Sequence, residues 1–158
     1  MSKTTAGTLL LEKMGIAFAL HPYEYDPDAP RIGLAAAEAL GIDPAQTFKT
    51  LMAEVDGKPV CVVVPSDREV SMKKLASCFA GKAGAMMKAP DAERLTGYKV
   101  GGIGPFGQKR KVPTALDETA ELYDVIYINA GQRGLLLSMA PADAVTAGEM
   151  RVADLCAE

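Results

Sequence analysis

Apolar residues recur with helical spacing in several stretches of the chain. In residues 4–14, Leu10, Leu11 and Met14 form an apolar stripe, and Gly15 follows directly. Glycine is the residue most often found just past the last turn of a helix, so the pattern predicts a helix that ends at Gly15.

Five further helical stretches are predicted from caps and stops. Residues 33–40 are alanine-rich and stop at Gly41. Asp43, Pro44 and Gln46 have the order of an N-cap, a first-turn proline and a capping-box glutamine, which predicts one helical turn before Phe48. The remaining three helices are expected at residues 71–79, capped by Ser71 and closed by Gly81, at residues 91–95 before Gly97, and at residues 141–147.

Period-two patterns predict the strands. The segment around His21 alternates, with a proline that marks an edge or a bend. Residues 48–55 and 60–64 are separated by Asp-Gly-Lys-Pro, which predicts a β-hairpin. Further strands are expected at residues 113–116, 125–128 and 135–139, the last two joined by a loop over residues 129–134. The strands outnumber those of a simple βαβ repeat, so we expect an α/β fold of the α+β type, with a mixed, barrel-like sheet flanked by helices.

Length and composition indicate one domain. The chain has 158 residues, of which 49% are hydrophobic, and it contains no obvious linker or repeat, so residues 1–158 are expected to form a single domain. The net charge of −3 means that contact with nucleic acid requires a local basic patch. Residues 109–111 supply one such cluster, and Lys73, Lys74, Lys82 and Lys88 supply another, although either cluster alone is more typical of a solvated surface.

The cysteines and the single histidine narrow the possible chemistry. Cys61, Cys78 and Cys156 are odd in number and lack C-x-x-C spacing, which favours a reducing compartment and a cytoplasmic protein. We see no signal peptide and no apolar run long enough to cross a membrane. His21 is the sole histidine, so most metal sites and most Ser-His or Cys-His nucleophiles are excluded. As a lone histidine it is expected to be structural.

A glycine-rich stretch over residues 101–107 is the main candidate for a ligand-binding loop, because its backbone can approach a ligand closely. Read from Gly102, it spells G-x-G-x-x-G, the dinucleotide fingerprint. That motif requires a helix opening at its third glycine, whereas residues 108–113 are basic, lack an N-cap and end in proline. We therefore disfavour a dinucleotide site. A glycine-rich turn between two strands remains the plain alternative.

Lys49 interrupts an otherwise apolar strand face. Period two places it with Leu51, Ala53 and Val55. Either its stem covers the core while the ammonium reaches water at the strand end, or the ammonium is held in a pocket as a functional cation able to bind an ester carbonyl or a phosphate. The pattern alone favours the first interpretation.

Five segments together carry a resemblance to a known family. They are Tyr23-Glu24 after His21, Phe48-Lys49-Thr50-Leu51, Thr96-Gly97-Tyr98, residues 100–107, and Gln132-Arg133-Gly134-Leu135. In their order and spacing, over residues 9–154, the chain resembles the YbaK family of bacterial aminoacyl-tRNA deacylases, which is related to the editing domain of prolyl-tRNA synthetase. Each segment alone is weakly specific, but the set covers nearly the whole chain.

The resemblance implies a function and a site. It implies hydrolysis of misacylated tRNA(Pro), with cysteine as the amino acid removed, without a metal or organic cofactor, and possible action beside prolyl-tRNA synthetase. The expected catalytic residues are Lys49, Gly101 and Gly102, and the expected substrate-binding residues are Tyr23, Thr50, Ile103, Gly104, Pro105 and Asn129. Main-chain N–H groups of residues 101–104 are expected to stabilise the oxyanion, while Lys49 anchors a phosphate or polarises the ester. A cysteine substrate is able to attack its own ester with its thiol.

Three positions depart from the pattern of the family. Gly104 stands where a serine is usual, Asn129 where serine is frequent, and Leu136 where some members carry aspartate. The departures at Asn129 and Leu136 leave open which amino acid is removed, so a deacylase for alanine or another small residue is one alternative. A non-catalytic module that binds tRNA or a nucleotide with the same fold is the other.

Overall fold

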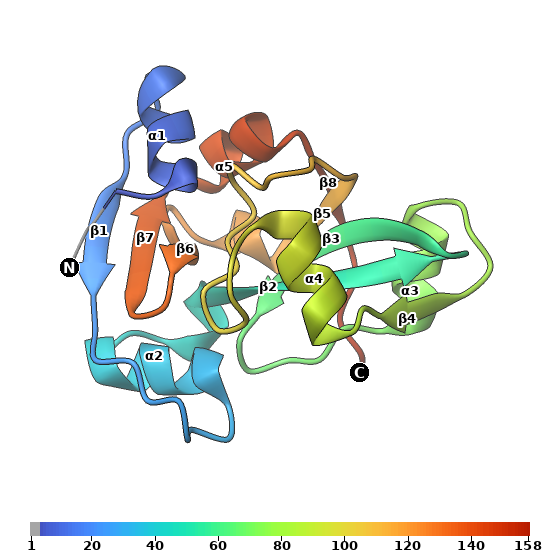
Figure 1. Ribbon diagram of the computed structural model, residues 1–158, viewed down its shortest axis with the longest axis horizontal. Coiled ribbons are helices and arrows are strands. Elements are labelled where there is room, and N and C mark those ends of the chain that lie inside the picture. Colours follow the sequence, from blue (N-terminus) through green and yellow to red (C-terminus); the bar gives the residue numbers. More distant parts are fainter. Residues whose placement is uncertain (1–3) are drawn as a thin grey trace.

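A computed structural model describes residues 4–158 and shows one mixed β-sheet with helices packed around it (Figure 1). The strands are β1 (Ala19–Pro22), β2 (Thr47–Val55), β3 (Lys58–Pro65), β4 (Gly84–Met86), β5 (Thr114–Asp117), β6 (Ile126–Gln132), β7 (Leu135–Met139) and β8 (Met150–Ala153). The helices are α1 (Ala6–Lys13), α2 (Ile32–Leu40), α3 (Met72–Cys78), α4 (Ala89–Thr96) and α5 (Pro141–Gly148), with 3-10 turns η1 (Pro44–Gln46) and η2 (Glu118–Leu122). The predicted class, a mixed sheet flanked by helices, is confirmed.

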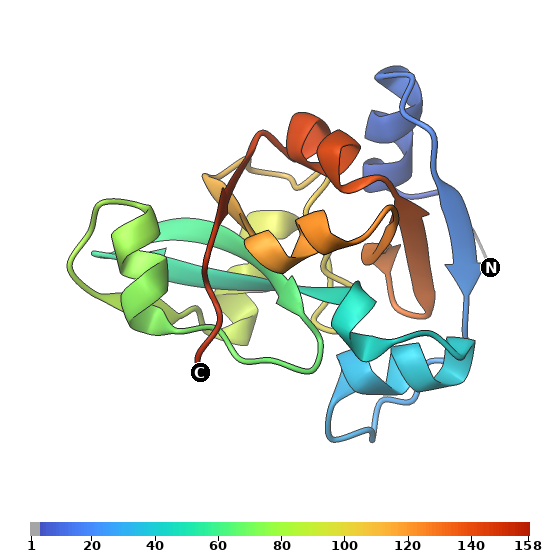
Figure 2. The same cartoon turned by 180° about the vertical axis from the view of Figure 1, so that it is seen from behind.

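The order of the strands is β1-β7-β6-β2-β3-β5-β8, and β4 pairs with β2. Antiparallel pairs join β1 to β7, β7 to β6, β3 to β2 and β4 to β2, whereas β2–β6, β3–β5 and β5–β8 are parallel. Figure 1 shows β1, β7 and β6 at one end of the molecule, with the β2–β3 hairpin crossing to the other end, where α3 and β4 lie. Figure 2, the view from behind, shows the C-terminal segment running across this hairpin. The central hairpin thus links the two ends of the sheet.

The predicted β2–β3 hairpin is confirmed, with a tighter turn than expected. Val55 pairs with Lys58, so only Asp56 and Gly57 form the turn. Both have positive φ angles, 52° and 81°, as the two-residue turns that match the twist of a hairpin require. Alternation along β2 divides the core into two clusters, one containing Phe48 and the other containing Ala53.

Most predicted helix ends are also found. The Ser71 hydroxyl accepts a hydrogen bond from the Lys74 N–H at the start of α3, as predicted. At the start of α1, Thr5 and Thr8 form a capping box that the sequence pattern did not predict. Gly41 and Gly97 end α2 and α4 in the left-handed conformation, with φ of 67° and 80°. Local cap chemistry therefore sets these boundaries.

Three local predictions are wrong in detail. Met14 is 44% exposed and does not belong to the buried face of α1, since Leu11 is the one residue of the predicted apolar stripe that is fully buried. Gln46 does not complete a capping box, since its side chain donates to the Val125 carbonyl. The left-handed residue after α3 is Ala80, not Gly81, whose N–H donates to the Ala76 carbonyl.

Sequence patterns missed or shortened several strands. β6 continues to Gln132 through a bulge that begins at Asn129, in place of the predicted loop over residues 129–134. β4, β8 and the 3-10 turn η2 were not expected. β4 has three residues and β8 is largely exposed, so neither carries the alternating apolar pattern from which strands are predicted.

Candidate active site

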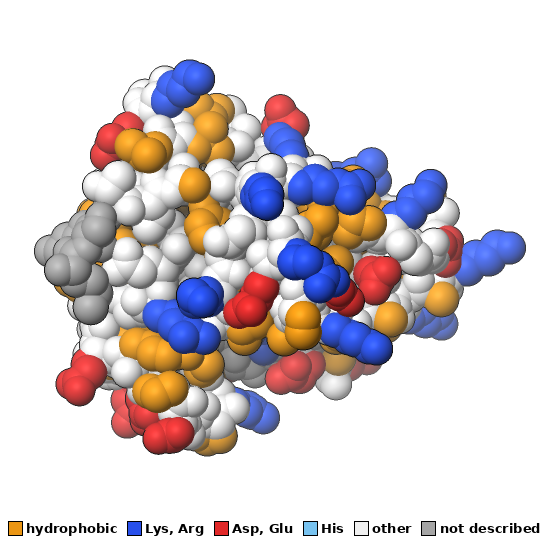
Figure 3. Space-filling model, viewed as in Figure 1, with side chains coloured by type: hydrophobic (Ala, Val, Ile, Leu, Met, Phe, Trp, Pro, Cys, Tyr) orange, Lys and Arg blue, Asp and Glu red, His pale blue; other side chains and the backbone are white. Residues whose placement is uncertain are grey.

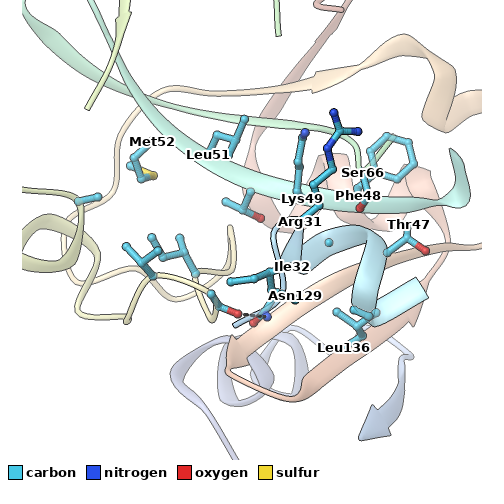
Figure 4. A pocket seen from close by; sticks show the side chains of 18 of the residues that line it. Arg31, Ile32, Thr47, Phe48, Lys49, Leu51, Met52, Ser66, Asn129 and Leu136 are labelled. Carbon is cyan, nitrogen blue, oxygen red and sulfur yellow. Dashed lines mark hydrogen bonds between the residues drawn. The ribbon is translucent and has the colours of Figure 1, made fainter. Parts of the chain in front are cut away.

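A cavity of about 490 Å³ lies among the start of α2, the middle of β2, the glycine loop over residues 101–107 and the end of β4 (Figure 4). Its lining has two ends. Arg31, Lys49 and Ser66 contribute polar groups at one end, and Met52 and Met86 contribute apolar surface at the other. The cavity therefore offers both cationic and apolar binding surface to one ligand.

The cavity opens onto a gap in the sheet beside β2. On the side away from β3, β2 pairs with β6 at Thr47 and Phe48 and with β4 from Ala53 onward, and none of the described strands pairs with residues 49–52 there. The Thr47 carbonyl accepts from the Ser66 N–H and therefore points toward β3. Because neighbouring residues of a strand direct their backbone N–H and C=O groups to opposite sides, every second residue counted from Phe48 directs these groups away from β3.

Thr50 directs its backbone N–H and C=O into this gap. Met52 has the same direction, and its carbonyl accepts from the N–H of Met87. No strand pairs with Thr50 on this side among the residues described. The Thr50 N–H is thus a main-chain donor at the wall of the cavity, which sequence reasoning did not identify.

Lys49 lies at the polar end of the cavity, with its side chain 22% exposed and its Nζ 3.6 Å from Glu69 Oε1. Leu51 and Ala53, on the same strand face, pack in the second core cluster. The ammonium therefore neither escapes fully to solvent nor lacks a partner. Since the Glu69 side chain is 71% exposed, the ion pair lies at the rim, and the cation remains accessible from the cavity.

Two buried hydroxyls in the lining have no hydrogen-bond partner among the described residues. They are Thr50 Oγ1 and Ser66 Oγ, and Ser66 is only 4% exposed. An unpaired buried polar group costs on the order of 1–3 kcal/mol, so such groups are rare in folded proteins. Both unpaired hydroxyls thus belong to residues that line one cavity.

The glycine loop follows α4 and leads to no helix until η2, so the dinucleotide interpretation is excluded by the surrounding elements. The loop also does not connect two strands directly, contrary to the plain alternative. The N–H of Gly102 donates to the Lys99 carbonyl at 2.8 Å and is committed to a turn. Within the described residues, the N–H groups of Gly101 and Ile103 donate to no acceptor, and both residues line the cavity.

Glycine is required in this loop by the close approach of other segments. Gly101 has φ of 92°, and a Cβ there would lie 2.5 Å from the Tyr25 hydroxyl. A Cβ on Gly104 would lie 2.5 Å from the Asn129 carbonyl oxygen, so the serine usual in the YbaK family does not fit unless β6 shifts. The departure at Gly104 is thus coupled to the path of β6 at Asn129.

The side chain of Asn129 ties the β6 bulge to the glycine loop. Its Oδ1 accepts from the N–H groups of Gly131, at 2.6 Å, and Gln132, at 3.1 Å. Its Nδ2 donates to the Gly101 carbonyl, the hydrogen bond drawn in Figure 4. Asn129 therefore positions Gly101, although it also lines the cavity.

Other contacts hold the loop from behind. Gln108 Nε2 donates to the Gly104 carbonyl at 3.1 Å, and the Tyr98 hydroxyl donates to the Phe106 carbonyl at 2.6 Å. The Arg133 Nε donates to the Val100 carbonyl. Because these bonds fix carbonyl groups, they orient the loop and leave the N–H groups of its cavity side available.

The predicted site residues fall into two groups. Tyr23, Lys49, Thr50, Gly101, Ile103 and Asn129 line the cavity, as does Leu136. The other three predicted residues do not line the cavity, although they belong to the same loop and are buried: Gly102, Gly104 and Pro105. The residues that sequence reasoning missed are Arg31, Gly33, Ser66 and Glu69, which carry no recognisable motif. One faint signal was available, namely a glycine inside an alanine-rich helix.

Tyr23 and His21 have different roles although they are close in sequence. Burial raises the pKa of the Tyr23 phenol, which lines the cavity as a neutral hydroxyl at pH 7. His21 does not line the cavity. Its Nε2 lies 2.8 Å from the Ser138 hydroxyl, and its ring meets Tyr127 edge-on. The structural interpretation of the lone histidine agrees with these contacts.

None of the cysteines lines the cavity, and burial raises the pKa of Cys61 to about 12, so its thiol stays protonated at pH 7. No group of three His, Cys, Asp or Glu side chains in the described part of the chain is arranged to hold a metal ion. None of the described helices is long and apolar enough to span a membrane.

Comparison with known proteins places this geometry in a family. The family model for the aminoacyl-tRNA editing domain matches residues 26–147. EbsC of Enterococcus faecalis, named as a Cys-tRNA(Pro)/Cys-tRNA(Cys) deacylase, is 41% identical over 109 residues, which cover 68% of this chain and 66% of EbsC. A proline–tRNA ligase of Streptomyces coelicolor is 40% identical over 91 residues, 58% of this chain and 16% of the ligase. The chain thus spans slightly under two thirds of EbsC and a small part of the ligase.

Two solved structures share the fold. One, of a trans-editing enzyme for prolyl-tRNA synthetase, has a TM-score of 0.84 at 22% identity and covers 99% of this chain and all of the other. The second, of a hypothetical protein, has a TM-score of 0.85 at 24% identity and covers 97% of this chain and all of the other. The family match, which extends over most of the sequence, leads to one conclusion: the chain belongs to the family of aminoacyl-tRNA editing domains.

Proposed function

We propose that this chain is a trans-acting editing hydrolase that removes a wrongly attached amino acid, cysteine, from tRNA(Pro). The observation that carries the proposal is the cavity itself, which combines two cations, Arg31 and Lys49, with unpaired hydroxyl and N–H donors, and whose described lining contains no cysteine or histidine. The family match and the name of EbsC support the substrate class.

The chemistry fits such a lining because an aminoacyl ester is already activated. Water adds to the carbonyl carbon, the bond to the ribose oxygen breaks, and the ribose hydroxyl leaves with a proton. The enzyme then mainly needs to orient the ester and stabilise the developing oxyanion. A cysteine substrate provides a second route, in which its own thiol attacks the ester and water opens the resulting thiolactone.

Gly101 and Thr50 are the proposed oxyanion donors. The Gly101 N–H is unpaired within the described residues, and the Thr50 N–H faces the gap beside β2. Gly102 is assigned a positioning role, because its N–H closes the turn with Lys99. Lys49 binds a negatively charged group of the substrate. The cavity around the substrate is shaped by Tyr23, Ile103 and Asn129. Gly104 and Pro105 lie in the part of the loop that does not line the cavity, and they are assigned a supporting role.

A basic face supports contact with tRNA. Residues 82–111 contain seven Lys or Arg and two Asp or Glu, although the whole chain has a net charge of −3. Figure 3 shows Lys and Arg side chains spread over the centre and right of this face, with some acidic side chains among them and others at the lower left. Arg94, Lys109 and Arg110 border one groove. Because phosphate contacts dominate RNA affinity, we propose that this face meets the acceptor end of the tRNA.

Hydrolysis of charged tRNAs tests the function. Cys-tRNA(Pro), Ala-tRNA(Pro), Pro-tRNA(Pro) and Cys-tRNA(Cys) are incubated with the purified chain, with and without prolyl-tRNA synthetase. We expect rapid loss of cysteine from tRNA(Pro) and a stable Pro-tRNA(Pro). Preferential loss of alanine would identify the alanine-specific alternative. Binding of tRNA without loss of any amino acid would contradict the proposal and indicate a non-catalytic module.

A further inference from the structure

The first turn of α2 presents unpaired N–H groups at the cavity. Arg31 is the N-cap, and its side chain makes no capping bond. Arg31, Ile32 and Gly33 all line the cavity. The first N–H groups of a helix have no partner within it, and together with the helix dipole they favour a bound anion.

Ser66 lies directly against this helix start. Its Oγ is unpaired within the described residues, and the residue is only 4% exposed. A Cβ on Gly33 would lie 2.8 Å from this oxygen. The same Cβ would lie 3.9 Å from Cβ of Lys49. Glycine inside a helix costs about 1 kcal/mol relative to alanine, so its presence here reflects the close packing of helix, serine and lysine.

The charged side chains at the polar end of the cavity are positive, except for one carboxylate at the rim. Arg31 and Lys49 are its cationic lining residues, and Glu69 is the acidic residue among the described lining. Figure 4 shows the side chains of Arg31 and Lys49 pointing in the same direction. Glu69 is 71% exposed and already paired with Lys49, so an incoming anion can replace it at little cost.

We propose that Ser66, the α2 N-terminus, Arg31 and Lys49 form a phosphate subsite, which holds the phosphate of the terminal nucleotide of the charged tRNA. The Ser66 hydroxyl donates to a phosphate oxygen, and the helix N–H groups and two cations neutralise its charge. The inference rests on the proposed function for the identity of the nucleotide. In this subsite Ser66 donates a hydrogen bond to the phosphate, Gly33 leaves room for the close packing of the helix start against Ser66, and Lys49 binds the phosphate by its charge.

Binding of small probes to the full chain tests the subsite without requiring turnover. Adenosine 5′-monophosphate, adenosine and inorganic phosphate are titrated against the wild type, Ser66→Ala and the control Ser77→Ala, whose serine is exposed on α3. We expect the monophosphate to bind at least about 10-fold more tightly than adenosine. Ser66→Ala is expected to weaken the monophosphate about 10-fold and leave adenosine unchanged, because a hydrogen bond to a charged group is lost. Inorganic phosphate competing with the monophosphate supports the subsite.

Thermal unfolding separates a binding role from a structural one. Removal of an unpaired buried hydroxyl is not expected to lower the unfolding midpoint of Ser66→Ala. A second variant, Gly33→Ala, pushes a methyl group toward Ser66 and is expected to weaken the monophosphate selectively. Equal binding of adenosine and its monophosphate, or equal weakening of both by Ser66→Ala, would overturn the subsite. If the chain deacylates tRNA but binds adenosine and its monophosphate equally, only the subsite is refuted. If the monophosphate binds in a Ser66-dependent way but no tRNA is deacylated, only the proposed function is refuted.

Discussion

Two buried polar regions of this molecule differ in whether their hydrogen bonds are satisfied. Asp117, at the end of β5, is 1% exposed and accepts bonds from the N–H and hydroxyl of Thr119 and from the N–H of Leu155. Thr50 and Ser66, at the cavity, have hydroxyls with no partner in the described chain. The first region fastens the C-terminal segment to the sheet, and the second leaves two hydroxyls unpaired at the cavity.

The two regions therefore have opposite consequences for stability. Burial alone opposes ionisation of Asp117, but the hydrogen bonds from Thr119, Leu155 and Cys156 outweigh it and lower the pKa of the carboxyl. Its bonds stabilise the folded state. The unpaired hydroxyls at the cavity destabilise the free protein by about 1–3 kcal/mol each. Substitutions in the two regions are expected to separate activity from stability.

Lys49→Ala is expected to have the largest effect, and on activity alone. Loss of the cation lowers kcat/KM for Cys-tRNA(Pro) about 10²–10³-fold, comparable to loss of one oxyanion donor. The unfolding midpoint stays close to that of the wild type, since the ion pair with Glu69 lies at the exposed rim. Steady-state deacylation and thermal unfolding are measured beside Lys58→Ala, an exposed lysine on the same hairpin. Wild-type deacylation by Lys49→Ala would remove Lys49 from the site.

Asp117→Asn is expected to affect stability alone. Loss of charged hydrogen bonds lowers the free energy of unfolding by about 2–3 kcal/mol, measured by urea denaturation at pH 7. Activity per folded molecule stays unchanged, because Asp117 does not line the cavity. The exposed Asp67→Asn is the control. Reduced activity at full stability would contradict the architectural role.

The acid side of the same prediction follows from the lowered pKa of Asp117. A depressed folded-state pKa stabilises the protein fully above the unfolded-state pKa, about 3.9, and this stabilisation is lost as the pH falls through the folded-state pKa. The wild type should therefore lose stability below about pH 4 more steeply than Asp117→Asn. Parallel acid denaturation curves would show that Asp117 is not the group responsible.

Thr50→Val is expected to change stability less than Asp117→Asn does, and in the opposite direction. Valine keeps the shape and removes the unpaired hydroxyl, so the free energy of unfolding rises by about 1 kcal/mol. If the hydroxyl contacts substrate, kcat/KM falls about 10-fold. Chemical denaturation and deacylation kinetics are compared with Thr119→Val, which removes a satisfied hydroxyl and should destabilise. A destabilised Thr50→Val with normal kinetics would abolish the contrast between the regions.

Much of the fold was predictable because its signals are local. Examples are the β2–β3 hairpin, the cap at Ser71, and the glycine stops at Gly41 and Gly97, which all depend on residues within one turn. β4 and β8 were missed because short or exposed strands are stabilised by their neighbours and not by their own pattern. The bulge at Asn129 was missed for a similar reason, since its side chain bonds the backbone of a strand predicted as loop.

The site was predictable only in part. Lys49 was conspicuous as a charge on an apolar strand face, and the glycine loop as a dense cluster of glycines. Gly102 seemed equivalent to Gly101 in the sequence, yet its N–H is committed to Lys99. Ser66 and Gly33 carry no motif, and their importance depends on the packing of α2 against the end of β3.

The sequence by itself determined the periodic elements, their caps, the candidate lysine and the candidate loop, because these follow from spacing along the chain. Tertiary structure decided which polar groups remain without partners. Whether a polar group is paired depends on segments distant in sequence, as where Gly33 packs against the unpaired Ser66 hydroxyl and where Asn129 Nδ2 donates to the Gly101 carbonyl. The cavity therefore owes its chemistry to groups that folding buries and leaves unpaired.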